Sequence, residues 1–165
     1  MSTPAPQTKT AQAVGRVLTK EQVLALVPQQ EPFRFIAEIL EVDDAHILSH
    51  YRYRPDHDFY RGHFPGNPIT PGVILAETMA QTGVVALGLY LVAKELGESE
   101  LASLVTMFTD VNVEFSGIVL PGETVTVEAT KMFFRRRKIR SAVQMRRQDG
   151  TIVCSGTCSG MGVPR

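Results

Sequence analysis

The length of 165 residues, of which 44% are hydrophobic, suits one domain with its own core. The 17 Lys and Arg residues are balanced by 17 Asp and Glu residues, so net charge gives no reason to expect nucleic acid or an anionic membrane as a partner. We therefore predict no nucleic-acid binding and no membrane association, and any electrostatic partner must be met by a local patch.

The first 18 residues are small, polar and interrupted by proline, without the apolar core of a secretory signal. We predict a disordered tail over 1–18, one domain over 19–165 and a cytoplasmic protein. The lack of acidic residues in this segment is also a trait of transit peptides. One arginine and no clear amphipathic face make a transit peptide the less favoured alternative.

A short helix and two strands are predicted at the start of the domain. Residues 19–22 have the spacing of a capping box, and the apolar residues that follow end at Pro28. Residues 33–42 and 46–54 have the character of strands, and we expect them to pair about a turn at Asp43-Asp44.

A Pro/Gly loop separates these strands from a long predicted helix, which Thr70 caps, Pro71 begins and residue 96 ends. Glu77 is its only charged residue up to Ala93, so the helix must be surrounded by protein. A membrane span is the alternative, but the uncharged stretch between Glu77 and Lys94 is shorter than the roughly 20 residues that a bilayer requires.

After this helix the hydrophobic period changes to two. Four further strands are predicted, at 101–115, 124–134, 138–147 and 151–159. Pro121-Gly122 and Asp149-Gly150 suit turns in which glycine takes a positive φ. Two strands, one buried helix and a four-stranded meander predict an α+β fold, with an antiparallel sheet wrapped around one long central helix.

The two cysteines, Cys154 and Cys158, stand four residues apart in the last predicted strand. That spacing is roughly 13 Å along a strand, which is beyond the reach of a disulfide. We expect buried, reduced thiols, as in a cytosolic protein.

The loop before the long helix contains a candidate acid/base residue, His63. Three prolines at every third position, 65, 68 and 71, stiffen the chain between His63 and the helix. His57 is expected at the loop surface. His46 and His50 are too far apart on a strand to share a metal, and we predict no metal site.

Glu77 is the second candidate, because a carboxyl on an otherwise uncharged helix either pairs in the interior or serves chemistry. Burial should raise its pKa, and the alternative is a salt bridge to Arg61. Gln81, one turn further, could hydrogen-bond Glu77 or satisfy a buried polar strip. The first-turn amides of Gly72 and Val73 could stabilise an oxyanion. The sequence contains no phosphate loop, dinucleotide fingerprint, serine elbow or cysteine nucleophile motif, so we predict no cofactor.

Residues 62–73 read G-H-F-P-G-N-P-I-T-P-G-V and are followed by E-T-M-A-Q at 77–81. This segment closely resembles the signature of the 3-hydroxyacyl-acyl-carrier-protein dehydratases, and a looser resemblance extends over roughly 130 residues. The resemblance implies a hot-dog fold and a homodimer, with assembly into a hexamer (a trimer of dimers) as a further option. It also implies a catalytic pair, His63 and Glu77, contributed by opposite subunits. The expected oxyanion and substrate-binding residues are Phe64, Pro71, Gly72, Val73 and Gln81.

Two departures from the family pattern bear on the substrate. The segment 27–33 lacks the family's His and Arg before Pro-Phe, and 114–117 replaces a basic R-F-x-R stretch. A specialised pathway is therefore an open alternative. Glu77 stands where the isomerising relatives have Asp, which favours dehydration without migration of the double bond.

We predict dehydration of a (3R)-3-hydroxyacyl thioester, linked to acyl carrier protein or pantetheine, to the trans-2-enoyl thioester in fatty-acid or related acyl-chain biosynthesis. Elimination needs a base, an acid and an oxyanion site, and His63 is the candidate base. Which residue moves which proton stays open at this stage. The alternatives are a hot-dog thioesterase and a non-catalytic acyl-binding subunit.

A basic cluster on one predicted hairpin is the candidate docking surface for an acidic carrier protein. Its residues are Arg135, Arg136, Arg137 and Lys138. The alternative is an ordinary solvated hairpin end.

Overall fold

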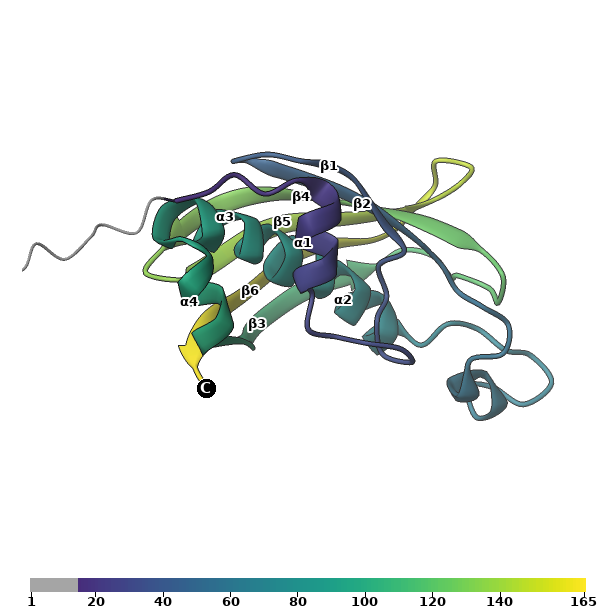
Figure 1. Ribbon diagram of the computed structural model, residues 1–165. Helices are drawn as coiled ribbons and strands as arrows, with labels where there is room; N and C mark the ends of the chain where they lie inside the picture. The colour runs from purple at the N-terminus through teal and green to yellow at the C-terminus, as the bar shows by residue number, and fades with distance from the viewer. Residues whose placement is uncertain (1–14) are drawn as a thin grey trace, which may run out of the picture.

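The computed structural model describes residues 15–165, and these residues form a six-stranded antiparallel sheet around a long helix (Figure 1). The elements are α1 (Lys20–Leu26), β1 (Glu38–Val42), β2 (His46–Arg52), the 3-10 helix η1 (Asp58–Arg61), α2 (Gly72–Ala80), the π-helix η2 (Gln81–Ala86), α3 (Leu87–Leu96), α4 (Glu98–Ser103), β3 (Leu104–Phe115), β4 (Thr124–Arg135), β5 (Lys138–Arg147) and β6 (Ile152–Pro164). The strand order is β1-β2-β4-β5-β6-β3. The predicted α+β fold with one central helix is confirmed.

Most of the predicted tail, residues 1–14, lies outside the described residues. The next residues pack along the end of the central helix. The amide of Arg16 donates to the carbonyl of Ala93 at 3.0 Å, and Leu18 is buried in the core. The packed part of the chain therefore begins upstream of α1.

Helix α1 begins with the predicted capping box. The Gln22 amide donates to Oγ1 of Thr19 at 3.3 Å, and the Thr19 amide donates to Oε1 of Gln22 at 2.9 Å. These two bonds satisfy donors that the first turn leaves without intrahelical acceptors. Val23 is the fully buried residue of this helix, which ends before Pro28.

Strands β1 and β2 form the predicted hairpin. Oδ1 of Asp43 accepts the amides of Ala45 and His46 at 2.7 and 2.9 Å, which closes the turn. The first strand is shorter than predicted, because residues 33–37 lie outside it. The carbonyl of Phe33 and the amide of Phe35 bond to the side chain of Gln81 and not to a neighbouring strand.

The central helix begins at Gly72, and the prediction that Thr70 caps it is wrong. The hydroxyls of Thr70 and Tyr60 share a hydrogen bond of 2.6 Å, and the cap position is taken by Pro71 without a side-chain bond. The helix then runs through α2, η2 and α3 and ends at Gly97, whose φ of +86° favours glycine.

By length and composition this helix could cross a membrane, but 61% of its most apolar window is buried inside the protein. The sheet wraps around it (Figure 1), so it is the core helix of the fold. Its π-helical segment was not predicted. There a Cβ on Gly83 would lie 2.9 Å from side-chain atoms of Ala129 and Val143. Oγ of Ser141 donates to the carbonyl of Gly83 at 2.6 Å, so the helix backbone lies directly on the sheet.

Three of the later predictions are wrong in detail. Residues 98–103, whose end was assigned to a strand, form α4, which follows the left-handed Gly97. Strand β3 does not continue into a four-stranded meander, because it pairs with β6 at the far edge of the sheet while β4 pairs with β2. The last strand also continues beyond the predicted end, to Pro164.

The outer edge of β3 has no strand partner within residues 15–165. Five large apolar side chains are exposed along it: Val105, Met107, Phe108, Val111 and Phe115. An open edge with apolar side chains is the kind of surface that pairs with another chain.

Both cysteines are buried thiols without a disulfide, as predicted. Burial raises the pKa of Cys154 to about 11 and that of Cys158 to about 12. Neither is a reactive thiolate at neutral pH.

Candidate active site

The imidazole of His63 is held from one side by the loop before α2. Its Nδ1 lies 3.1 Å from the carbonyl oxygen of Ile69, which can only accept a hydrogen bond. The backbone of His63 is held too, because its amide donates to Phe59 at 2.9 Å and its carbonyl accepts from Ile69 at 3.0 Å. In the neutral ring Nδ1 therefore carries the hydrogen, and Nε2 is the nitrogen that can accept a proton.

Phe64 forms an apolar surface beside this imidazole. The two rings stack with centroids 4.1 Å apart and an interplanar angle of 24°. The side chain of Phe64 is about half exposed, so it can contact a bound molecule as well as His63.

Glu77 lies in the second turn of α2, in partly buried surroundings. Burial raises the pKa of its carboxyl, and a hydrogen bond of 2.8 Å from Nε2 of Gln81 acts in the opposite direction. The alternative pairing with Arg61 is wrong, since Arg61 pairs with Asp58 at 3.1 Å. A carboxyl in these surroundings tends to keep its proton.

Gln81 is fully buried and serves both roles considered from the sequence. Its Nε2 donates to Glu77 and to the carbonyl of Phe33 at 2.8 Å, and its Oε1 accepts the amide of Phe35 at 2.8 Å. The side chain therefore joins the candidate acid to the segment between α1 and β1.

The start of α2 presents two backbone donors. The Pro71 carbonyl accepts the amides of Ile74 and Leu75, so those of Gly72 and Val73 have no acceptor within the helix. Val73 is 76% exposed, whereas a Cβ on Gly72 would lie 3.2 Å from the Phe115 ring. Phe115, at the end of β3, therefore lies next to Gly72, whereas Val73 is exposed to solvent.

His63 and Glu77 make their hydrogen bonds to different partners within the part of the chain that the structure describes. Among residues 15–165 no hydrogen bond, ion pair or ring contact joins His63 to Glu77, and no described cavity contains either residue. In Figure 1 the loop with η1, which precedes His63, extends beyond the sheet at the lower right.

His57 is buried, and its prediction as a surface residue is wrong. Its side chain is 5% exposed, and its Nε2 lies 2.9 Å from the hydroxyl of Tyr51. The aromatic residues nearby in the sequence, Phe59 and Tyr60 among them, are the signal that could have indicated burial.

The basic cluster forms the turn between β4 and β5. Arg136 and Arg137 have φ angles of +50° and +64°, and Arg137 pairs with Glu100 of α4 at 2.5 Å. Arg135, Arg136 and Lys138 are exposed.

This turn and the start of α2 lie at opposite ends of the sheet (Figure 1). Lys138 pairs with Met161, which pairs with Met107 near the start of β3, whereas Gly72 lies against Phe115 at its end. Eight residues of strand separate Met107 from Phe115, a distance of roughly 26 Å.

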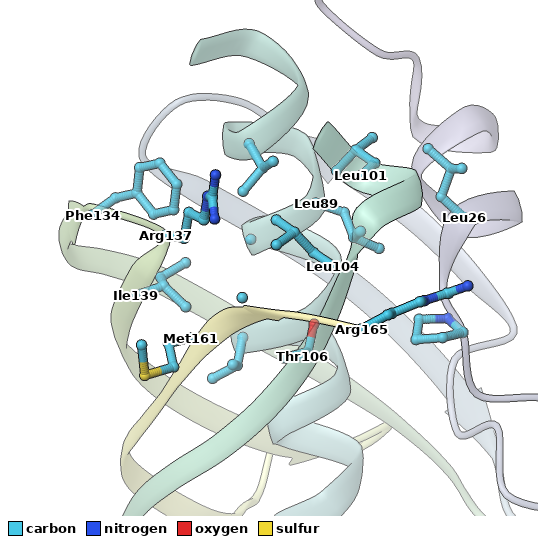
Figure 2. Close-up of a pocket in the computed structure, with 15 residues that line it drawn as sticks. Leu26, Leu89, Leu101, Leu104, Thr106, Phe134, Arg137, Ile139, Met161 and Arg165 are labelled. Carbon is cyan, nitrogen blue, oxygen red and sulfur yellow. The ribbon is translucent and has the colours of Figure 1, made fainter. Parts of the chain in front are cut away.

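A cavity of about 60 Å³ lies beside the central helix, between α1, α4, the start of β3 and the end of β6 (Figure 2). Apolar side chains and polar groups both line it, and the apolar side chains include Leu26, Val84, Leu89, Val92, Leu104, Phe134, Ile139 and Met161. Figure 2 shows Arg137 and Arg165 on opposite sides of it. Because Val84 is seven residues beyond Glu77, the cavity begins roughly 10 Å further along the same helix.

An antiparallel sheet around one central helix, with a partly buried carboxyl on that helix and a histidine in the preceding Pro/Gly loop, defines a hot-dog protein. The chain belongs to the FabA-like domain family, whose match covers residues 27–157.

Individual relatives agree with this assignment. The chain is 32% identical to the 3-hydroxyacyl-(acyl-carrier-protein) dehydratase FabZ of Herpetosiphon aurantiacus over 142 residues, which cover 85% of this chain and 94% of the relative.

Solved structures share the fold. The dehydratase heterocomplex ApeI:P of Xenorhabdus doucetiae is similar with a TM-score of 0.65 and 13% identity, over 87% of this chain and 91% of that one. A thioesterase of Haemophilus influenzae is similar with a TM-score of 0.64 and 16% identity, over 92% of this chain and 94% of that one.

Proposed function

We propose that this chain is a 3-hydroxyacyl-(acyl-carrier-protein) dehydratase, which removes water from a (3R)-3-hydroxyacyl thioester and releases the trans-2-enoyl thioester. The observation that carries the proposal is the orientation of His63. Because Nδ1 donates to the Ile69 carbonyl, Nε2 is the ring nitrogen left to act as a base.

The base and the oxyanion donors account for the first half of the elimination. Nε2 of His63 takes the C2 proton of the substrate, and the electrons of that C–H bond move towards the thioester. The negative charge then develops on the thioester oxygen. The amides of Gly72 and Val73, at the positive end of α2, are the donors for this oxygen.

Glu77 supplies the acid for the second half. Burial raises the pKa of its carboxyl, which favours the protonated form. The C3–O bond breaks, the hydroxyl takes the proton of Glu77, and water leaves. His63 then holds one extra proton and Glu77 lacks one, so a proton passes from His63 to Glu77 before the next cycle.

A second copy of the chain completes the site. The open apolar edge of β3 is the surface for pairing, and Phe115 at its end contacts the start of α2. Pairing there would bring the His63 loop of one copy to Glu77 of the other. This arrangement accounts for the lack of contact between the two residues within one chain.

The same dimer accounts for the basic turn. Within one chain, Lys138 lies roughly 26 Å from the start of α2 along the sheet. Antiparallel pairing of two β3 strands sets the Leu104 end of one beside the Phe115 end of the other. The turn at 135–138 then lies near the active site of the second copy, where an acidic carrier protein can bind.

The apolar cavity of Figure 2 fits the far end of an acyl chain. It lies along the central helix beyond Glu77, and the leucine, valine, isoleucine and phenylalanine side chains in its lining offer an alkyl chain apolar contacts. A cytoplasmic location fits the two buried thiols.

The thioesterase alternative requires an ionised carboxylate that activates water. The raised pKa of Glu77 opposes that role, and hydrolysis by this route does not use the positioned His63. The similarity to solved thioesterases is a similarity of fold.

The test is incubation of the purified chain with carrier-linked 3-hydroxyacyl substrates of graded length, followed by mass analysis. Loss of one water from the acyl group supports the proposal. His63→Ala should abolish the loss of water. His46→Ala, which removes the histidine at the start of β2, is the matched control. Release of free carrier thiol would identify a thioesterase, and binding without turnover would identify a non-catalytic subunit.

A further inference from the structure

His57 and Tyr51 form a buried hydrogen bond that the proposed chemistry does not use. The two side chains are 5% and 6% exposed, and Nε2 of His57 lies 2.9 Å from the Tyr51 hydroxyl. Breaking a bond between two buried groups leaves both without water as a substitute partner. The bond therefore holds the loop to β2 firmly.

His57 is connected to His63 through η1. Its carbonyl accepts the Tyr60 amide at 3.1 Å, and its ring stacks on Phe59 at 4.9 Å with an interplanar angle of 17°. The Phe59 carbonyl in turn accepts the amides of Gly62 and His63, at 3.2 and 2.9 Å. A shift of His57 therefore moves the backbone of His63.

A second buried bond holds the other side of η1. The hydroxyls of Tyr60 and Thr70 lie 2.6 Å apart, and the Thr70 amide donates to the Val119 carbonyl at 2.8 Å. Thr70 stands immediately before Pro71, so this bond sets η1 relative to the start of α2.

We infer that His57, held by Tyr51, is a positioning residue for His63 and sets the direction of its imidazole relative to the substrate. The inference rests on the proposed dehydratase function. Burial lowers the pKa of His57, so the ring is neutral at physiological pH and can share the Tyr51 hydroxyl proton. A displacement of about 1 Å at a catalytic group can cost about 100-fold in rate, so a modest shift of η1 is sufficient.

Four variants test the inference. Tyr51→Phe and His57→Leu remove the bond from either side, and His57→Gln restores an acceptor near the position of Nε2. Tyr90→Phe is the matched control, because it removes a tyrosine hydroxyl from α3, outside the loop, where burial and Asp44 raise its pKa. The measurements are kcat and KM for a 3-hydroxyacyl thioester, urea unfolding, and hydrogen exchange of the Gly62 and His63 amides.

Tyr51→Phe and His57→Leu should lower kcat by about tenfold with KM within twofold of wild type, and speed exchange of both amides. His57→Gln should recover most of kcat. Tyr90→Phe should change neither kcat nor the exchange of the Gly62 and His63 amides. A kcat within twofold of wild type in folded Tyr51→Phe overturns the inference.

Exchange separates this inference from the proposed function. If the wild type forms no enoyl product, the dehydratase proposal fails by itself. Unchanged exchange of the Gly62 and His63 amides in Tyr51→Phe would then overturn the positioning role as well. Faster exchange of these amides would support the conclusion that His57 holds the backbone of His63 in place, whichever reaction His63 serves.

Discussion

Gln81 donates a hydrogen bond to Oε1 of Glu77 across 2.8 Å, and the same buried amide group binds the backbone of Phe33 and Phe35. The orientation of the proposed acid therefore depends on the segment between α1 and β1. That segment is also where this sequence departs from the family pattern.

Replacing Gln81 with Leu should damage both stability and catalysis. The substitution leaves the carbonyl of Phe33 and the amide of Phe35 without partners, so the free energy of unfolding should fall by about 2 to 5 kcal/mol. Loss of the bond to Glu77 should lower kcat at least tenfold in the folded fraction. Urea unfolding at fixed protein concentration and kcat corrected for folded protein check both.

The neighbouring Thr82 offers a matched control. Its hydroxyl bonds Ser49 at 2.7 Å and the Thr78 carbonyl at 3.2 Å, and neither bond involves Glu77. Thr82→Val should lower stability and keep kcat. Similar losses of kcat in the two variants would show that any buried hydroxyl or amide here affects catalysis, and would contradict the specific link to Glu77.

The stability of the protein should depend on pH through Glu77. Its pKa in the folded protein lies above the ordinary value, so between those two values the folded chain binds more protons than the unfolded chain. This contribution to stability is complete below the ordinary value and is lost as pH rises through the raised pKa. Glu77→Gln lacks this loss, so it should gain stability relative to wild type as pH rises from the ordinary carboxyl value through the raised pKa of Glu77. Its kcat should fall by about 100-fold or more.

Urea unfolding of both proteins across this pH range is the measurement. A difference in unfolding free energy that stays constant with pH would mean that burial does not raise the pKa of Glu77.

Local signals in the sequence predicted much of the fold. The capping box at Thr19, the alternation along β2 and the uncharged character of the central helix each depend on neighbouring residues only. The position of β3 beside β6 could not be predicted, because pairing across the sheet depends on contacts between residues far apart in the chain. The π-helical segment likewise depends on how closely Gly83 approaches the sheet.

The candidate site was predictable as a set of residues and not as an arrangement. The prolines after His63 and the lone charge of Glu77 marked both residues in the sequence. The burial of His57 and the true role of Thr70 depend on the hydroxyls of Tyr51 and Tyr60, which only the folded chain brings within reach.

A site shared between two copies predicts complementation. His63→Ala and Glu77→Ala should each be inactive as homodimers. After random mixing, half of the dimers are mixed and each has one intact site, so activity should return to about one quarter of wild type. Activity measured before and after subunit exchange checks this, with exchange confirmed by native mass spectrometry. Confirmed mixing without recovery would place both residues in one subunit.

Charge reversal at the basic turn should weaken the binding of a carrier-linked substrate and leave that of a pantetheine thioester unchanged. Arg137 should be left in place, because it pairs with Glu100 and its loss would disturb α4. Arg135→Glu with Arg136→Glu should raise KM for a carrier-linked substrate by about tenfold at low salt and less at high salt. KM for a pantetheine thioester should stay unchanged.

Arg136→Gly separates docking from folding at this turn. The φ of +50° at Arg136 suits glycine, so this variant loses the charge and relieves the backbone. It should be at least as stable as wild type and still bind the carrier-linked substrate less well. A wild-type KM for the carrier-linked substrate in both the double Glu variant and Arg136→Gly would show that the turn is ordinary solvated surface.

Gly88 should determine how long an acyl chain the enzyme accepts. It lines the apolar cavity beside the central helix, and a Cβ placed there would have Ile139 as its nearest neighbour, at 3.9 Å. Gly88→Ala therefore fits without strain and should stabilise the helix by up to about 1 kcal/mol. Gly88→Leu directs three further carbons into a cavity of about 60 Å³ and should fill much of it. Turnover of long-chain 3-hydroxyacyl substrates should then fall at least tenfold, whereas short-chain turnover stays near that of Gly88→Ala. Equal losses at all chain lengths would show that the cavity does not hold the acyl chain.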